Sequence, residues 1–204
     1  MAGIGLYGVY YAKATMSGGA VTGYTGGTKQ MGKAISASFE LNDTSANPLY
    51  ANNAIAEHDS QAASGGTLDL TLDKITSTAI GDLYGLTPQT STVSVGGDSV
   101  TGTGFDWKGT EQSNNVGVAF IRWHQENDSR AVHEVVLYRN VIFDPPKLDA
   151  QTMGETVEWQ TPELTGTVIG KEGDGANAWY KTRTFATQAA AEAYIVTEFG
   201  AVST

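Results

Sequence analysis

The sequence has 204 residues, a formal net charge of −10 and no cysteine. A chain of this length can bury about 70% of the surface that its unfolded form exposes, so we expect one substantial domain over residues 1–204. The lack of cysteine excludes disulfides, thiolate nucleophiles and cysteine zinc sites, and the acidic excess argues against a surface made to hold nucleic-acid phosphates. No window approaches 18 consecutive apolar residues, so no membrane-spanning helix is expected.

Hydrophobic periodicity predicts β-strands along most of the chain. The first strand is expected at 4–11, and the segment "KAISASFEL" alternates so that Ile35, Ala37 and Phe39 share one face. In "GGTLDLTLDKI" the three leucines face one way, while the threonines and aspartates face the other. This alternation is typical of a strand with one face on a core and one in water.

Two helices are expected among these strands. In "TSTAIGDLYGL" a hydroxyl residue at 76–78 can cap a short helix that ends near Gly85. The segment "FATQAAAEAYIVTEFG" predicts a C-terminal helix over 187–200, with Thr as its N-cap and Gly as its stop. Ile195 and Phe199 lie one turn apart and would form its buried stripe.

The remaining segments complete a mainly β (α+β) prediction. Between residues 86 and 115 the chain is rich in Gly, Ser, Thr and Asn, which indicates loop with a short hairpin around "SVGGDSV". "ETVEWQTPELTGTVIG" alternates less cleanly, and Pro162 marks an edge, a bulge or a break because it cannot donate to a ladder. Many strands with one or two helices laid on a sheet suggest a β-sandwich.

The stretch "WHQENDSRAVHEVVLYRNVIF" has two interpretations. Its His124, Glu126 and His133 are possible metal ligands, but the stretch also reads as a plain hairpin. A second cluster, "EHD" at 57–59, consists of adjacent residues, which rarely converge on one ion, so a solvated turn is favoured there.

The charge pattern of this stretch favours the hairpin. A three-residue loop at 127–129 sets Glu126 opposite Arg130 and Arg122 opposite Glu134, whereas a two-residue loop loses both ion pairs. In the favoured register the two histidines point to opposite faces and cannot share a metal. A bulge between them would restore a common face, so the metal site stays open as an alternative.

No other motif indicates catalysis. The Gly-rich segments "GYTGGTK" and "GGDSVTGTG" lack the Lys-Ser/Thr ending of a phosphate-binding loop, and no nucleophile elbow is present. We therefore expect a protein that is not an enzyme and uses no cofactor.

The order of several segments resembles the major tail proteins, or tail tube subunits, of long-tailed bacteriophages of the siphophage type. These segments cover most of the chain: "LYGVYYAKAT", "KAISASFELN", "PLYANNAIAE", "GGTLDLTLDKI", "DLYGL", "VGVAFIRWH", "VVLYRNVIF" and "WQTPELTGTVIG". Each is unspecific alone, but their order and spacing, especially "LYANN" and "WQTPELTGT", carry the resemblance.

This resemblance implies an architectural protein of the virion, made in the cytoplasm of the bacterial host. The family fold is a β-sandwich with a flanking helix, and its subunits form hexameric rings that stack into a hollow tube. Genomic DNA passes through the tube without specific binding during ejection. The implied partners are other copies of the chain and the tape measure and tail terminator proteins.

The resemblance implies a long loop between subunits, and together with the alternation of β-strand residues it leads to a hypothesis about the lumen. A long loop at 41–66 would reach a neighbouring subunit, because a loop of this length in a compact domain is uncommon unless it is functional. Its interface residues would be Pro48, Leu49, Tyr50, Asn52, Asn53 and Ile55. The acids Asp69, Asp73 and Glu158 would face the lumen and repel DNA. The alternatives are a surface loop without a partner, and acids that face outward solvent.

Two other classes of function stay open. A monomeric β-sandwich that serves as a binding or adhesion module would show a ligand groove and no self-assembly. A metal hydrolase would need His58, His124 and His133 to converge.

Overall fold

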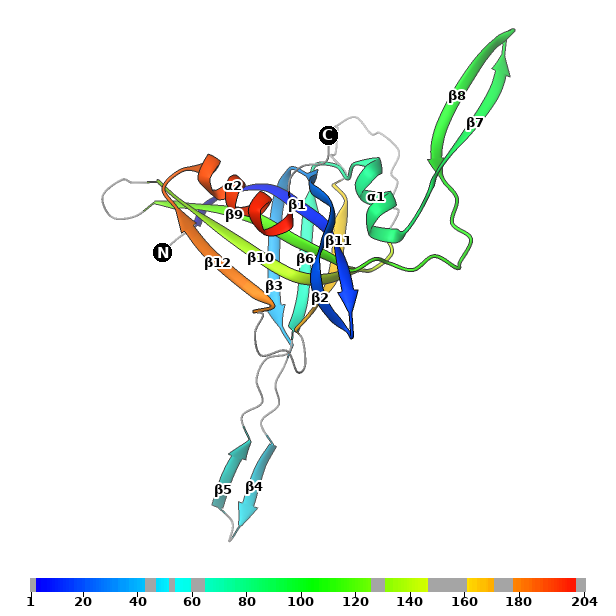
Figure 1. The fold of residues 1–204 in the computed structure, drawn as a ribbon. Helices are drawn as coiled ribbons and strands as arrows, with labels where there is room; N and C mark the ends of the chain where they lie inside the picture. Colours follow the sequence, from blue (N-terminus) through cyan, green and yellow to red (C-terminus); the bar gives the residue numbers. More distant parts are fainter. Residues whose placement is uncertain are drawn as a thin grey trace, which may run out of the picture.

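The computed structural model describes residues 3–42, 47–51, 54–59, 65–125, 131–146, 161–170 and 178–200. These residues form twelve strands and two helices (Figure 1). In chain order they are β1 (Gly3–Ser17), β2 (Ala20–Gly32), β3 (Ala34–Leu41), β4 (Asn47–Ala51), β5 (Ala54–Asp59), β6 (Gly65–Leu72), α1 (Ser77–Tyr84), β7 (Pro88–Val95), β8 (Asp98–Phe105), β9 (Val116–Gln125), β10 (Ala131–Phe143), β11 (Glu163–Ile169), β12 (Tyr180–Phe185) and α2 (Gln188–Phe199).

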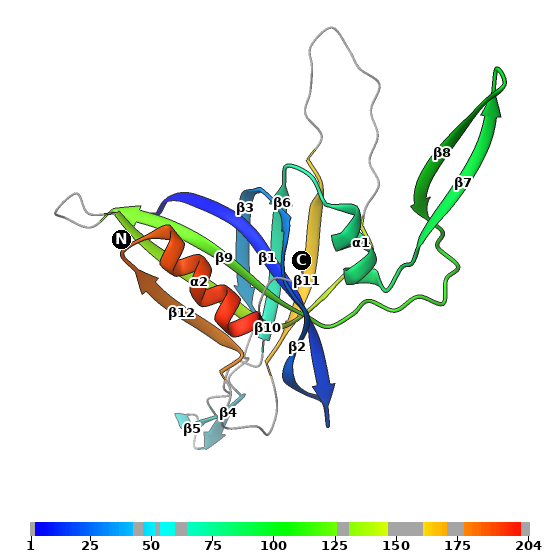
Figure 2. The same cartoon turned by 45° about the horizontal axis from the view of Figure 1, so that its top comes forward.

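Eight strands form one antiparallel sheet in the order β2-β1-β9-β10-β11-β6-β3, with β12 paired to β10. Strand β10 belongs to two parts of this sheet, because residues 133–138 pair with β12 and residues 141–143 pair with β11. Its register with β9 shifts between Tyr138 and Val141, and such an irregularity bends a strand. Figures 1 and 2 show β3, β6 and β11 running across β1, β9 and β10.

The two parts of the sheet face each other across the main core. Leu68, Leu70 and Leu72 of β6 project into it, and Val118 and Phe120 of β9 meet them from the other part. The three leucines are at most 1% exposed, so the alternation predicted for this strand is confirmed. Helix α1 closes the same core with three buried side chains, which are Ala79, Leu83 and Tyr84.

A second core lies on the outer face of β9 and β10, beneath α2. Ala191, Ile195 and Phe199 of the helix are buried against Ile121 and Leu137. Figure 2 shows α2 lying along this face beside β9 and β12. The stripe predicted for this helix is therefore confirmed, and the molecule consists of one helical layer over two facing parts of a sheet.

The caps expected from the sequence are present in both helices. The Thr76 side chain accepts a hydrogen bond from the Ala79 amide, and Gly85 ends α1 in the left-handed conformation. The Thr187 side chain accepts from the Ala190 amide at the start of α2. The mainly-β prediction is confirmed by the eight-stranded sheet. The described residues form two helices, whereas the resemblance implied one flanking helix. Neither helix is long and apolar enough to cross a membrane.

One sequence prediction of orientation is wrong. Ile35 was expected on the core side of β3 with Ala37 and Phe39, yet its side chain is 53% exposed. The register between β3 and β6 shifts between Ala34 and Ser36, so Ile35 is the extra residue of an irregular pair and leaves the alternation.

Candidate assembly surface

The segment predicted as a long assembly loop contains a hairpin. Strand β4 pairs antiparallel with β5, with Leu49 opposite Glu57 and Tyr50 opposite Ile55. The side chains of Pro48, Leu49, Tyr50 and Ile55, and the whole of Asn52 and Asn53, lie outside the described residues. The structure therefore shows the backbone pairing of this hairpin and not the contacts of the side chains predicted for the interface.

The predicted lumen face is an ordered array of small polar and acidic side chains on β3, β6 and β11. The strand registers place them in three rows of directly opposed residues. These rows are Ser36, Thr71 and Glu163; Ser38, Asp69 and Thr165; and Glu40, Thr67 and Thr167. We call these nine residues the hydroxyl face; it includes three acids and no base.

Hydrogen bonds between strands order this face. The Thr165 hydroxyl donates to Asp69 Oδ1 at 2.7 Å, and Ser36 Oγ donates to Thr71 Oγ1 at 2.8 Å. Asp69 is exposed, as the lumen prediction requires. The Thr165 hydroxyl thus holds the Asp69 carboxylate in place on this face.

Asp73 has a local structural role beside its charge. Its Oδ1 accepts hydrogen bonds from the backbone amides of Lys33 and Lys74, each at 2.8 Å. The bond from the Lys33 amide is the largest cause that lowers the pKa of Asp73 below its ordinary value. This carboxylate therefore fastens the turn after β6 to the end of β2. The third predicted acid, Glu158, lies outside the described residues.

The two histidines of the hairpin project to opposite faces, as its register predicted. His124 pairs with Val132 and His133 with Trp123, and the register has no shift from the pair Ala131–Gln125 to the pair Tyr138–Val118. The Arg122 guanidinium donates to Glu134 Oε2 at 2.7 Å across the strands. Both the register and this ion pair are confirmed, while the predicted pair of Glu126 and Arg130 lies outside the described residues. Within the described part of the chain, no group of three His, Asp or Glu residues could hold a metal.

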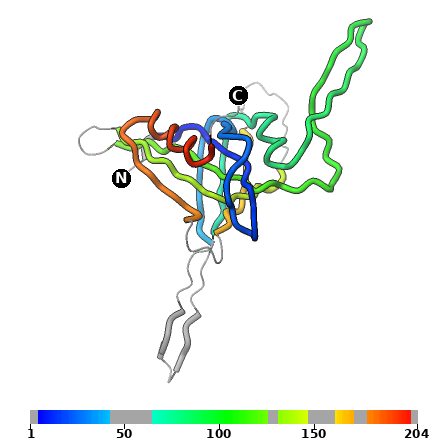
Figure 3. The backbone as a smooth tube through the Cα atoms, in the orientation of Figure 1, coloured from blue at the N-terminus to red at the C-terminus, as the bar shows by residue number. Residues whose placement is uncertain are grey.

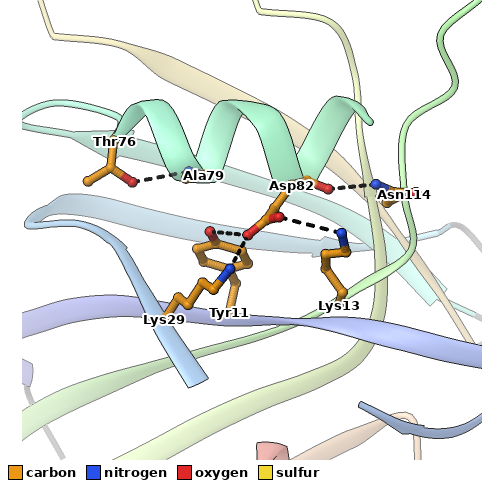
Figure 4. Close-up of polar contacts among 7 residues, drawn as sticks. All are labelled: Tyr11, Lys13, Lys29, Thr76, Ala79, Asp82 and Asn114. Carbon is orange, nitrogen blue, oxygen red and sulfur yellow. Dashed lines mark hydrogen bonds and ion pairs between the residues drawn. The ribbon is translucent and has the colours of Figure 1, made fainter. Parts of the chain in front are cut away.

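A charged cluster that no sequence pattern indicated is centred on Asp82 of α1 (Figure 4). Asp82 Oδ2 accepts hydrogen bonds from Lys29 Nζ at 2.7 Å and from the Tyr11 hydroxyl at 2.9 Å. Lys13 Nζ lies 3.5 Å from Oδ1. On the backbone side, the Asn114 amide donates to the Asp82 carbonyl at 2.7 Å. One residue thus connects α1 to β1, to β2 and to the segment before β9.

The pKa values in this cluster follow from burial and charge. Burial alone would raise the pKa of Asp82, but hydrogen bonds from Lys29 and Tyr11 outweigh it and hold this pKa below its ordinary value. Burial and the adjacent carboxylate raise the pKa of Tyr11. Asp82 is therefore an ionised clamp and Tyr11 a neutral donor, an arrangement that stabilises structure.

An open cleft of about 580 Å³ lies beside this cluster, lined by residues of β1, β2, α1 and α2. At its edge the Tyr10 hydroxyl donates to Glu192 Oε1 at 3.2 Å. Burial, followed by the charge of Glu192, raises the pKa of Tyr10 to about 12. Lys29 and Glu192 both line the cleft, and both already make hydrogen bonds within the chain, Lys29 with Asp82 and Glu192 with Tyr10.

The most exposed described element is the hairpin of β7 and β8, which we call the arm. It leaves the molecule after α1 and returns to β9 (Figure 3). Every residue from 88 to 104 is exposed. Gly96 and Gly97 at its tip both have positive φ, as a two-residue type I′ turn requires. The short hairpin predicted around "SVGGDSV" is confirmed, but eight residues pair on each side.

No model of a known protein family matches this chain, and no curated protein is significantly similar to it.

Proposed function

We propose that this protein is a structural subunit of a bacteriophage virion, with a β-sandwich of the tail-tube type. Copies associate into hexameric rings, and the rings stack into the tail tube that conducts DNA during ejection. The single observation that carries the proposal is the order and spacing of the sequence segments from "LYGVYYAKAT" to "WQTPELTGTVIG".

The arrangement of the strands supports an architectural role. The β4–β5 hairpin lies within the segment that the resemblance assigns to contacts between subunits. The arm offers a second long hairpin, and β3 stands at one end of the described sheet. Strand edges and hairpins are elements that other chains can extend by main-chain hydrogen bonds.

The charge of the hydroxyl face supports its placement toward the lumen. Glu40, Asp69 and Glu163 stand on adjacent strands of this face with no lysine or arginine between them. In a ring each of these charges would be repeated by every subunit. Because screening acts over about 8 Å at physiological salt, DNA close to such a wall would be repelled and would pass without binding.

Negative-stain electron microscopy and sedimentation over a range of concentrations test this proposal. Each copy carries a net charge of −10, so added salt should favour association by screening repulsion between copies. Rings or hollow tubes that increase with concentration and salt are the expected result. A monomer under every condition would contradict the proposal and favour the monomeric binding module, for which the cleft between α1 and α2 would be the first place to look for a ligand.

A further inference from the structure

The arm carries three valines that are exposed in the isolated chain. Val93, Val95 and Val100 are 58%, 61% and 51% exposed. Val93 lies directly opposite Val100, so these side chains share one face of the hairpin. Residues 88–105 contain one charged side chain, Asp98. A two-stranded hairpin alone is marginally stable in water, and its edges here carry no lysine to discourage pairing.

The other face of the arm is made of hydroxyl side chains. The register pairs Thr90 with Thr103, Thr92 with Thr101 and Ser94 with Ser99. Thr92 Oγ1 and Thr101 Oγ1 lie 3.3 Å apart, within hydrogen-bond distance. The arm therefore has one face with three valines, on which Asp98 lies opposite Val95 at the tip, and one face of uncharged hydroxyls.

The part of the sheet that ends at β3 also has one apolar face and one face rich in hydroxyls, although its hydroxyl face includes three acids. Its inner side is the leucine core, and its outer side is the hydroxyl face. Strand β3 is eight residues long, as are β7 and β8. Its Ile35 and Leu41 are 53% and 55% exposed, so apolar surface stands uncovered near both ends of the strand.

The other sheet edges are protected against added strands. Strand β2 has three register shifts, and its Thr28 amide already donates to the Gly200 carbonyl at 3.3 Å. Strand β12 carries Lys181 and Arg183, and charged side chains on an edge oppose pairing. Strand β3 has a single register shift, between Ala34 and Ser36, and a single charged side chain, Glu40, so among the described edges of the large sheet it is the least protected.

We propose that the arm of one copy joins the β3 edge of a second copy as added strands of its sheet. The valine face of the arm then extends the core side and covers exposed Leu41, while its threonine face extends the hydroxyl face. A second copy is the fitting partner because every chain carries both the arm and the β3 edge, and their strands have the same length. The arm brings a single charge to the contact, although each whole chain carries −10. The contact joins two different surfaces, so its repetition forms closed rings or open filaments.

This inference rests on the proposed function in that copies of the chain associate. The first test compares Val93→Lys with Thr92→Lys, which place the same charge at adjacent exposed positions on opposite faces of the arm. Sedimentation should show that Val93→Lys raises the concentration needed for association about tenfold or more, because a charge replaces a valine at the contact. Thr92→Lys should change it less than about threefold, since its face stays in water. Equal thermal melting of both variants and the parent chain would show that folding is unchanged.

The second test uses the absence of native cysteine. Chains with Ser38→Cys on β3 are mixed with chains carrying Thr92→Cys or Thr101→Cys on the arm, and a short bismaleimide is added. A cross-linked dimer is expected in at least one mixture. Thr182→Cys on β12 replaces Ser38→Cys in the control and should give no dimer.

The outcomes separate this inference from the proposed function. Rings or tubes that form equally well with Val93→Lys, and that give no link between the arm and β3, would overturn the inference and leave the proposed function standing. A parent chain that never associates would overturn both.

Discussion

Replacing Asp82 with alanine should destabilise the fold by about 2–4 kcal/mol. Asp82 is 16% exposed and accepts a 2.7 Å bond from Lys29, and hydrogen bonds to charged groups contribute about 1.5–3 kcal/mol. The Tyr11 hydroxyl loses its acceptor in a residue that is 1% exposed, at a cost of about 1–3 kcal/mol. Lys13 is 42% exposed at 3.5 Å and adds little. The higher helix propensity of alanine offsets about 0.5 kcal/mol.

Urea unfolding followed by circular dichroism measures this loss, and the melting temperature should fall by about 6–12 °C. The pKa of Asp82 is lower in the folded than in the unfolded chain, where its ordinary value is 3.8. Its contribution is therefore complete above that value and is lost as the pH falls through the folded pKa. The difference between the parent chain and Asp82→Ala should therefore stay constant at neutral and mildly acidic pH and shrink as the pH falls below 3.8.

Asp98→Ala is the matched control, because it removes one exposed acid from the arm and should change stability by less than about 0.5 kcal/mol. Asp82→Asn keeps the shape and an acceptor for Tyr11 while it removes the charge, so its loss should lie between those of the other two variants. A loss below about 1 kcal/mol for Asp82→Ala, or a deficit independent of pH, would refute the clamp.

Three further predictions concern packing, turn geometry and charge. Gly117→Ala should destabilise by about 1–3 kcal/mol in urea titrations, because its Cβ would lie 2.5 Å from Tyr24 and 2.6 Å from Phe199, beneath α2; an equal effect of Gly104→Ala, where nothing lies within 4 Å, would contradict this reasoning. Asp73→Ala should lower the melting temperature more than Asp73→Asn, because the asparagine amide oxygen can still accept hydrogen bonds from the two backbone amides. The reverse order would show that the charge of Asp73 matters more than its hydrogen bonds to these amides. Asp69→Lys should slow DNA ejection from particles that still assemble, with Asp106→Lys, at an exposed acid outside the arm and the hydroxyl face, as the control. Ejection at the parent rate would exclude Asp69 from the lumen.

Short-range patterns in the sequence were enough to predict individual elements. The alternation of the leucines in β6, the caps of both helices and the charge pair of Arg122 with Glu134 each involve neighbours along the chain or across one hairpin. Propensity, capping and cross-strand charge act over that range. These predictions therefore needed no knowledge of which strands meet in the sheet.

The candidate surface was predicted only in part. The alternation in β6 correctly placed Asp69 on an exposed face, but the long polar segment before β9 gave no sign that its hairpin would be an arm with eight residues on each side. Thr, Ser and Gly occur equally in loops and in exposed strands, so composition could not distinguish them. The two valines at alternate positions, Val93 and Val95, were the available sign of a strand in this segment.

The tertiary structure decided what depends on distant contacts. Asp82 is separated by 71 residues from Tyr11 and by 53 from Lys29, so no local pattern could single it out among the acids. Ile35 left the core face because a register shift against β6 overrides alternation within β3. The sequence by itself determined the strands, the helix caps and one hairpin register through local forces. The order of the sheet, the forked pairing of β10 and the edge left open at β3 follow from the packing of two faces around one core, which only the folded chain specifies.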